Sequence, residues 1–319
     1  MSNSKSRPKK LLAITGGVGG AKLALGFAQI LTPDEVMFAV NVADDFTHLG
    51  LHISPDIDSL TYALAQQNNQ ELGWGRAGET WQFVETLGSL GGDDWFRLGD
   101  KDMALHMRRR GLLDQGATLT EATAEIVQRM GISHSVIPVS DDPIHTVVHS
   151  DQGDLAFQHY FVRERCQPAV NGFRFEGLSD ATLNPALAAY LTNCDGVIIC
   201  PSNPFVSVAP VIEVDGLLSA LANIPTIAVS PIVSGTAIKG PAAKMMQELN
   251  MPATALAVAE HYQQTYPNLL SGFVIDSTDA GSLPAFNLPT IATQSVMTSL
   301  QDRVTLAEAC LDFFDQLAA

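Results

Sequence analysis

The sequence predicts an α/β fold: a Rossmann-like, doubly wound and mainly parallel sheet, with a helical and hairpin insertion capping the predicted site. Three observations lead to this class. Short apolar runs alternate with helical patterns along most of the chain, which is the arrangement of βαβ units in parallel sheets. A glycine-rich turn follows the first apolar run. The 319 residues are 46% hydrophobic and 16% charged, which is enough to bury a substantial core.

Composition and charge exclude several classes of protein. The 34 acidic residues outnumber 18 basic ones, for a formal net charge of -16. This argues against nucleic-acid binding, which depends on phosphate neutralisation by lysine and arginine. No apolar run reaches the roughly 18 residues of a membrane span, so no membrane partner is expected. The four cysteines form neither a CxxC pair nor a zinc-like cluster, so we expect buried thiols in a reducing compartment, the cytoplasm.

The first half of the chain carries two strand–helix units and a long helical stretch. Apolar runs mark the strands and helical spacing marks the helices. In order, we expect a flexible lead-in over residues 1–10, a strand over 11–15, a helix to about 31, a strand over 36–42, a helix near 60–67 and mostly helix over 73–131. Glycines are expected to break this last region at Gly91-Gly92 and at Gly111.

The second half returns to strands. We expect a strand over 134–139, a hairpin of 145–149 with 155–161, strands over 196–200 and 226–229, and an amphipathic helix over 305–317. Asp151-Gln152-Gly153 is the predicted hairpin turn. No linker interrupts the chain, so residues 11–319 are predicted to form one domain, with the cap inserted at about 73–175.

Residues 16–20 read Gly-Gly-Val-Gly-Gly between the first strand and its helix. Such a turn presents N–H groups and a positive helix end to an anion, so Gly17, Gly19 and Gly20 are predicted to hold a diphosphate. Lys22 either assists in binding the diphosphate or is simply an exposed lysine in the first turn of the helix. A P-loop would need Ser or Thr after Lys22, and a dinucleotide fingerprint would need glycine in its place, so neither matches. The alternative is a tight turn whose glycines serve close packing alone.

Four aspartates follow the second strand, at the edge of the sheet where α/β proteins bind ligands. They are Asp44, Asp45, Asp56 and Asp58. Magnesium binds a few carboxylates together with substrate phosphates, so Asp45, Asp56 and Asp58 are the predicted metal ligands. The alternative is that Asp56 or Asp58 caps the following helix, although capping does not account for all four.

Charged residues gather again at 97–102. Arg97 and Lys101 are suited to phosphate, and Asp100 or Asp102 to a hydroxyl. The alternative is a capped helix with a solvated basic face at 108–110.

Two polar residues, Ser202 and Asn203, follow the strand over 196–200. They are suited to a ribose or phosphate, and the alternative is an ordinary βα loop. The sequence shows no nucleophile elbow, HExxH motif or Ser/His/Asp set, so no candidate for covalent catalysis is visible.

These motifs, taken in order, resemble those of one family. They are Gly16–Lys22, Asn41–Asp45, Ile53–Asp58, Leu98–Asp102, Ser140–Pro143, Pro201–Pro204 and Val229–Ile232. From Leu11 onward the chain resembles the 2-phospho-lactate transferases, the CofD-like family of deazaflavin coenzyme F-420 biosynthesis. Each motif alone is moderately specific, but the ordered set is specific.

The resemblance implies a magnesium-dependent transfer between two small molecules. The donor is a guanosine diphosphate that carries a three-carbon acid, and the acceptor is the deazaflavin precursor Fo. The terminal ribityl hydroxyl of Fo attacks the phosphorus bearing the acid, and GMP leaves. The acid is phospholactyl in archaeal members and enolpyruvyl in many bacterial ones, and the motifs do not choose between them. The resemblance also implies a homodimer.

The resemblance and the residues together give a hypothesis for the site. The predicted roles are diphosphate binding by Gly17–Gly20, magnesium binding by Asp45 with Asp56 or Asp58, Fo contacts by Asp58 and Arg97, a cleft shaped by Gly99, Asp100, Lys101 and Asp102, and guanosine binding by Ser202 and Asn203. Asp45 or Asp58 is expected to accept the hydroxyl proton. Such transfers depend on positioning and charge stabilisation, and alignment can supply roughly 7–11 kcal/mol.

Two other functions fit parts of the sequence. A non-catalytic regulator, similar to bacterial gluconeogenesis factors that bind nucleotide-sugars, would share the glycine turn and the Ala-Asp-Asp segment. Residues 55–58 and 98–102 favour the transferase. A nicotinamide-dependent dehydrogenase rests on the strand–glycine–helix opening alone, and the mismatched fingerprint counts against it.

Overall fold

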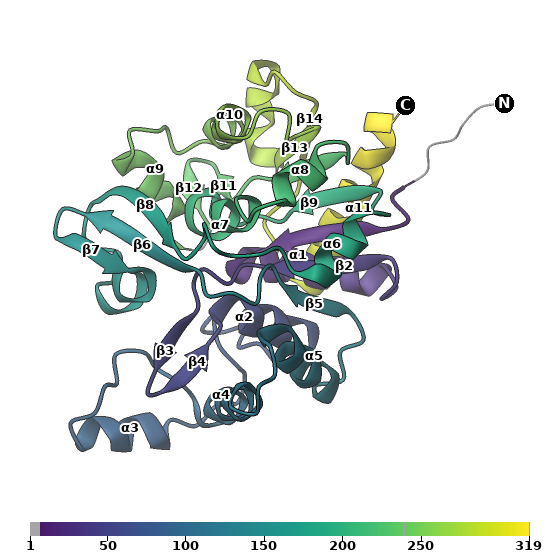
Figure 1. Ribbon diagram of the computed structural model, residues 1–319. Coiled ribbons are helices and arrows are strands. Elements are labelled where there is room, and N and C mark those ends of the chain that lie inside the picture. Colours follow the sequence, from purple (N-terminus) through teal and green to yellow (C-terminus); the bar gives the residue numbers. More distant parts are fainter. Residues whose placement is uncertain (1–6, 239, 319) are drawn as a thin grey trace.

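The computed structural model describes residues 7–238 and 240–318, and its centre is a seven-stranded sheet (Figure 1). All neighbouring strands are parallel, in the order β14-β13-β10-β9-β1-β2-β5. The strands are β1 (Leu11–Thr15), β2 (Val36–Val40), β5 (Ser135–Pro138), β9 (Gly196–Ile199), β10 (Thr226–Val229), β13 (Gly272–Asp276) and β14 (Thr290–Thr293). The predicted α/β class is confirmed.

The inner strands are apolar throughout because helices cover the sheet. Strand β1 is buried along its whole length, as are β9 and β10, which is typical of parallel strands that are covered on both faces. Helix α1 (Gly17–Ile30) packs against α2 (Pro55–Leu64) and α11 (Leu300–Ala318).

Of the predicted lead-in, residues 1–6 lie outside the described residues. Arg7 forms an ion pair with Asp312 of α11, and the backbone N–H groups of Lys9 and Lys10 donate to Asp195.

A smaller group of elements lies below the sheet in Figure 1. It contains the hairpin β3 (Phe46–His48) and β4 (Leu51–Ile53), with α3 (Gln82–Ser89) and α4 (Asp100–Leu113). The hairpin lies between the strand expected over 36–42 and the helix expected near 60–67, where neither a strand nor a helix was predicted. Helix α5 (Leu119–Arg129) then leads into β5, so one strand of the main sheet comes from within residues 73–175.

A second sheet of three antiparallel strands has the order β7-β6-β8. Its strands are β6 (His145–Ser150), β7 (Gly153–Ala156) and β8 (Val170–Glu176). The hairpin turn is confirmed, but the strand over 155–161 is wrong after Ala156, because η1 (His159–Arg163) is a π-helix. The aromatic residues of this segment have a high propensity for strands, but tertiary packing overrides that propensity. In the π-helix, Tyr160 is fully buried.

Two helix boundaries also differ from expectation. Gly111 lies inside α4 and does not break it, because the buried side chains of this helix outweigh the roughly 1 kcal/mol cost of one glycine. Helix α2 begins at Pro55 rather than near residue 60, since proline is well suited to the first helical position. Asp56 and Asp58 therefore lie in its first turn, and Ser54 is the N-cap residue. Neither aspartate caps the helix.

The remaining elements connect or cover the strands. They are α6 (Pro185–Leu191), η2 (Pro204–Val208), α7 (Ala209–Ile212), α8 (Leu217–Leu221), β11 (Ile232–Val233), β12 (Thr236–Ala237), α9 (Ala242–Glu248), α10 (Ala255–Thr265) and η3 (Ser277–Ala285). Within residues 7–238 and 240–318, no helix is long and apolar enough to cross a membrane.

Candidate active site

The strand order reverses at β1, which lies between β2 and β9. In open α/β sheets, ligands bind outside the carboxyl ends of the strands at such a switch point. Two loops meet there, the glycine turn after β1 and the Pro201-Ser202 segment after β9. The backbone N–H of Gly16 donates to Ser202 Oγ at 3.2 Å, so the structure brings these two predicted regions together.

Close packing accounts for most of the glycines in the turn. A Cβ on Gly19 would collide with the carbonyl oxygen of Pro201, and a Cβ on Gly20 would collide with Thr15 Oγ1. Gly17 has φ +66, a left-handed conformation that favours glycine. Close packing therefore requires glycine at positions 19 and 20, and it leaves open what the N–H groups of the turn bind.

The carboxylate of Asp56 lies at the start of α1. Its Oδ1 accepts from the Gly17 N–H at 2.6 Å, and its Oδ2 accepts from Asn41 Nδ2 at 3.0 Å. Burial raises the pKa of Asp56 to about 6, against these two hydrogen bonds, which lower it. Asp56 thus fastens the first turn of α2 to the glycine turn, and Asn41 is a residue of the site that sequence reasoning did not single out.

Asp44 and Asp45 are buried beside Asp56, and each has one oxygen without a partner. Asp45 Oδ2 accepts from Ser54 Oγ at 2.7 Å and lies 2.9 Å from His52 Nε2. The Oδ1 atoms of Asp44 and Asp45 are buried and have no hydrogen-bond partner in the described structure. Burial raises the pKa of both carboxyls, and the charge of Asp56 raises that of Asp44 further. Such a pair of carboxylates would be stabilised by a cation.

Asp58 is bound differently from the other three aspartates. Both its oxygens accept from the guanidinium of Arg109 on α4, with Nη1 3.2 Å from Oδ2. Arg109 is 1% exposed, so the predicted solvated basic face is wrong at this residue. Residues 102, 106 and 109 are spaced by four and three, which places Asp102, His106 and Arg109 on one face of α4. This spacing was the signal in the sequence from which a buried Arg109 could have been predicted.

Among the described residues, no group of three or more His, Cys, Asp or Glu side chains has the arrangement of a metal site. The predicted ligands Asp45, Asp56 and Asp58 are therefore not assembled as a set. Asp56 and Asp58 are occupied by Gly17, Asn41 and Arg109. Of the four aspartates, Asp44 and Asp45 are the ones that each have a buried oxygen without a hydrogen-bond partner in the described structure.

The aspartates predicted at 97–102 belong to the packing around α3 and α4. Asp102 accepts from the hydroxyl of Tyr62 and lies 3.3 Å from His106 Nε2. Asp100 accepts from Thr80 and from the Phe83 N–H.

The two cations of the same segment lie on the outside. The guanidinium of Arg97 lies over the Trp81 ring, 4.8 Å from its centroid. Lys101 is exposed, and its backbone N–H donates to Glu79. In the described part of the chain, neither side chain forms a hydrogen bond or ion pair with the acidic cluster, which consists of Asp44, Asp45, Asp56 and Asp58.

Lys22 and Asn203 make packing contacts next to the site. Lys22 Nζ donates to the carbonyl of Met297 at 2.9 Å. Asn203 Oδ1 accepts from the Phe205 N–H at 2.9 Å at the start of η2, and its Nδ2 lies 3.2 Å from Met245 Sδ.

A group of aromatic side chains lies beside Asp45. Phe46 contacts Trp95 and Phe96, with ring centroids 6.0 Å and 4.8 Å away. His48 packs edge-on against Trp95 at 5.2 Å. Phe46, Trp95 and Phe96 are half-buried and form an aromatic wall, whose member Phe46 directly follows Asp45 in the chain.

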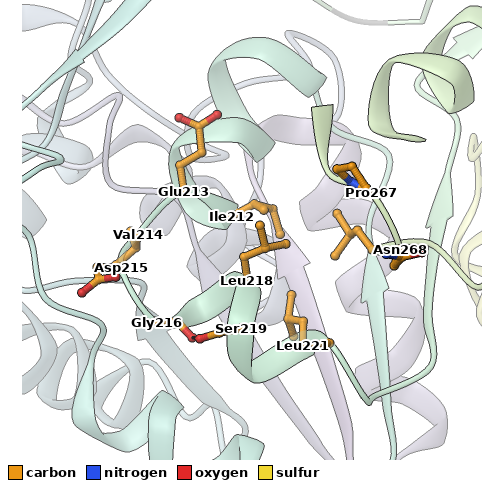
Figure 2. Close-up of a pocket in the computed structure, with 12 residues that line it drawn as sticks. Ile212, Glu213, Val214, Asp215, Gly216, Leu218, Ser219, Leu221, Pro267 and Asn268 are labelled. Carbon is orange, nitrogen blue, oxygen red and sulfur yellow. Dashed lines mark hydrogen bonds between the residues drawn. The ribbon is translucent and has the colours of Figure 1, made fainter. Parts of the chain in front are cut away.

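A cavity of about 630 Å³ lies away from these residues (Figure 2). It is lined by the segment Ile212–Ala222 and by Pro267–Leu269. These segments lead into the amino ends of β10 and β13, at the edge of the sheet opposite the glycine turn. No predicted site residue lines this cavity, so it is not part of the candidate site.

Comparison with known proteins gives one consistent family. Residues 11–282 match the family model described as 2-phospho-L-lactate transferase CofD. The 2-phospho-L-lactate transferase of Methanosarcina acetivorans is 34% identical over 308 residues, covering 96% of this chain and 99% of that protein. The phosphoenolpyruvate transferase of Streptomyces griseus is 31% identical over 320 residues, covering 97% of this chain and all (100%) of that protein. 

Solved structures show the same fold in more distant proteins. The crystal structure of a UPF0052 family member from Bacillus halodurans superposes with a TM-score of 0.65, covering 95% of this chain and 99% of that chain. The two sequences are 14% identical, so this likeness concerns the fold alone.

Proposed function

Since the chain belongs to the CofD family of 2-phospho-L-lactate transferases, we propose that it moves a phospho-three-carbon-acid group from a guanosine diphosphate donor to Fo. The group is 2-phospholactyl or phosphoenolpyruvyl, the acceptor is the ribityl hydroxyl of the deazaflavin, and GMP is released. The observation that carries the proposal is the buried acidic cluster beside the glycine turn. At the switch point, Asp44 and Asp45 each have one oxygen without a hydrogen-bond partner among residues 7–238 and 240–318.

Magnesium is the cation that we assign to this cluster. Magnesium is usually held by one or two carboxylates together with substrate phosphates, and Asp44 with Asp45 would supply those carboxylates. The ion would neutralise charge on the donor diphosphate. Asp58, whose oxygens are both bonded to Arg109, is a positioning residue in this proposal and not a metal ligand.

The transfer needs one bond to form and one to break. The hydroxyl oxygen of Fo bonds to the phosphorus that carries the acid, and the bridging P–O bond breaks with its electron pair leaving on GMP. The hydroxyl proton passes to His52, a half-buried side chain whose ring is held through Nε2 by Asp45. Sequence reasoning gave His52 no role. A histidine oriented by a carboxylate is the usual arrangement for a general base.

The acceptor and nucleotide regions follow from neighbouring contacts. The aromatic wall of Phe46, Trp95 and Phe96 supports binding of a planar ring beside Asp45, because aromatic rings pack favourably in offset or edge-on contacts. We retain the other roles expected from the sequence in this proposal. Arg97 would contact Fo, Ser202 and Asn203 would contact the guanosine side of the donor, and Gly17–Gly20 would bind its diphosphate.

The decisive experiment is a product assay with purified protein, Fo, magnesium, GTP, and a guanylyltransferase with its phospho-acid to form the donor. We expect GMP and a phospho-acid-linked deazaflavin, both measured by mass spectrometry. Asp45→Asn should lower the rate at least about 100-fold and raise the magnesium requirement, because it removes a ligand and the histidine's partner. Asp34→Asn, exposed in the turn before β2, is the matched control.

Three outcomes would count against the proposal. Full activity of Asp45→Asn with unchanged magnesium dependence would remove the acidic cluster from the mechanism. Wild-type rates in His52→Gln would remove the proton acceptor. Absence of any linked deazaflavin from the wild-type protein, together with tight binding of a nucleotide-sugar, would instead support the regulator.

A further inference from the structure

Three consecutive carbonyl oxygens, those of residues 43–45, accept hydrogen bonds from another part of the fold. The backbone N–H of Thr146 donates to the first of them at 2.8 Å. Gln158 Nε2 donates to the second at 3.3 Å, and His145 Nδ1 to the third at 3.0 Å. A carbonyl oxygen can only accept, so both side chains are donors here. All three donors come from β6 or from the residue before η1.

The carboxylates of Asp44 and Asp45 depend on this stretch of backbone for their placement. Each has a buried Oδ1 without a hydrogen-bond partner among residues 7–238 and 240–318. Burial, the charge of Asp56 and the charge of Asp45 all raise the pKa of Asp44, because the neighbouring carboxylates repel one another. Side chains that repel one another and have few partners are placed largely by the backbone from which they start. The donors to residues 43–45 hold that backbone.

The segment that carries Gln158 also contacts the aromatic wall. Gln158 is 5% exposed and directly precedes η1. The next residue, His159, packs edge-on against Trp95, with ring centroids 4.9 Å apart. Single π-helical turns are rare and occur frequently at functional sites. His145 differs from Gln158 in being exposed at the first position of β6, so its replacement leaves the core unchanged.

We propose that Gln158 and His145 are positioning residues, which hold Asp44 and Asp45 in the arrangement that binds a divalent cation. Both act through backbone carbonyl oxygens and supply no ligand themselves. This inference rests on the proposed function, since it concerns the carboxylates assigned to magnesium there. Replacing a side chain that orients metal ligands typically lowers metal affinity or activity about 10–100-fold, so the effect is large enough to measure.

Gln158→Met and His145→Phe each remove one donor and keep the approximate size of the side chain. The probe is Mn²⁺ in the presence of GDP, with free Mn²⁺ measured by electron paramagnetic resonance. We expect each variant to bind Mn²⁺ about tenfold more weakly or worse. In hydrogen exchange without metal, the peptide covering residues 41–46 should exchange faster than in the wild type. His145→Asn, whose amide can donate from near the position of Nδ1, should restore most of the affinity.

Matched controls come from the same hairpin. Gln152 is exposed in the turn between β6 and β7, and His149 pairs with Asp154 and not with residues 43–45. Gln152→Met and His149→Phe should therefore bind Mn²⁺ like the wild type. Thermal unfolding establishes that each variant is folded at the assay temperature. If Gln158→Met does not fold, the exposed His145 decides the test.

The product assay separates this inference from the proposed function. His145→Phe should lower kcat about tenfold while the KM for Fo changes by less than about twofold, since misplaced carboxylates weaken stabilisation of the transition state. A wild-type protein that forms no linked deazaflavin, although His145→Phe still loses Mn²⁺ affinity, would contradict the proposed function alone. The inference is overturned if the wild type does not bind Mn²⁺, if Gln158→Met and His145→Phe bind it like the controls, or if His145→Asn loses as much affinity as His145→Phe.

Discussion

At the scale of single residues, the pair Asp58–Arg109 links two parts of the molecule that are far apart in the chain. Asp58 is in the first turn of α2, next to the acidic cluster, and Arg109 is on α4. Both side chains are almost completely buried. His106 Nδ1 lies 3.7 Å from Asp58 Oδ2 and extends the network. Burying either charge alone would cost several kcal/mol of stability, and each side chain supplies the counter-charge that the other needs.

Arg109→Met should destabilise the protein by about 3–5 kcal/mol, because Asp58 then remains buried without a counter-charge. Chemical denaturation measures the change. Arg129→Met is the control, since that side chain is 77% exposed and surface substitutions usually change stability by about 0.5 kcal/mol or less. In the double variant Arg109→Met with Asp58→Asn, part of the loss should return. A single variant as stable as the control would contradict the importance of this pair.

At the scale of elements, two glycines within helices have opposite surroundings. Gly19, in the first turn of α1, faces the carbonyl oxygen of Pro201, which belongs to the loop after β9. Gly111, inside α4, has no atom within 4 Å of where a Cβ would lie. The first glycine sets how closely two loops of the site approach, and the second serves no visible packing purpose.

Gly19→Ala should therefore cost about 1–3 kcal/mol, since the collision is with backbone and must move a whole loop. It should also weaken binding of guanosine nucleotides. Gly111→Ala should stabilise the protein by about 0.5–1 kcal/mol through lower backbone entropy. Thermal unfolding and nucleotide titration measure both. Equal effects of the two substitutions would be inconsistent with the packing described for the turn.

Helix α10 contacts η2 through His261, whose ring lies 5.0 Å from that of Phe205. Burial lowers the pKa of His261 from its ordinary value of 6.5. Above pH 6.5 the histidine is neutral in both the folded and the unfolded protein, so it does not change the free energy of unfolding. As the pH falls through 6.5, the unfolded chain binds the proton more readily than the folded protein, so the free energy of unfolding declines.

The expected result is that wild-type stability falls more steeply than that of His261→Phe between pH 7 and pH 5. Denaturant midpoints across this range measure the two slopes, and the difference between them isolates His261 from other titrating groups. Parallel slopes would show that the pKa of this ring is the same in the folded protein and in the unfolded chain.

The elements differ in how well the sequence predicts them, for physical reasons. Strands β1, β9 and β10 are short apolar runs followed by turn residues, and their pattern is local, so they were predictable. Asp45 and Asp56 were predictable as candidates for the site because both lie in the acidic segment that follows the second strand. Arg109 was not, because its burial depends on Asp58, 51 residues earlier in the chain. The π-helix over 159–163 was missed because its aromatic residues also suit a strand.

At the scale of the whole molecule, the described residues form one large hydrophobic core and two small ones, and we expect the elements around the small cores to be less stable. The large hydrophobic cluster includes the main sheet and α1. The smaller clusters, around Tyr62 with Leu105 and around Ile53 with Leu98, hold α4 and the β3–β4 hairpin. Helix α3 contributes a single buried residue, Val84. Regions with few buried apolar contacts open at a lower free energy than the rest.

Hydrogen exchange should therefore separate these regions. Amides of α3 should exchange first, those of α4 next, and those of β1 and β9 only by global unfolding. In Arg109→Met, exchange of α4 should accelerate much more than exchange of β9. Mass spectrometry of peptic fragments follows each segment. Equal opening free energies for α4 and β9 would mean that the molecule unfolds as a single unit.

The position of β1 inside the sheet, between β9 and β2, has a consequence for synthesis. Its neighbour β9 ends at Ile199, so a chain growing from its amino end exposes one fully apolar strand edge until that segment has emerged. At ribosomal rates of about 5–20 residues per second, the wait is roughly 10–40 s. Unpaired apolar edges associate with other chains. During translation, β1 is therefore a segment that a chaperone would need to protect.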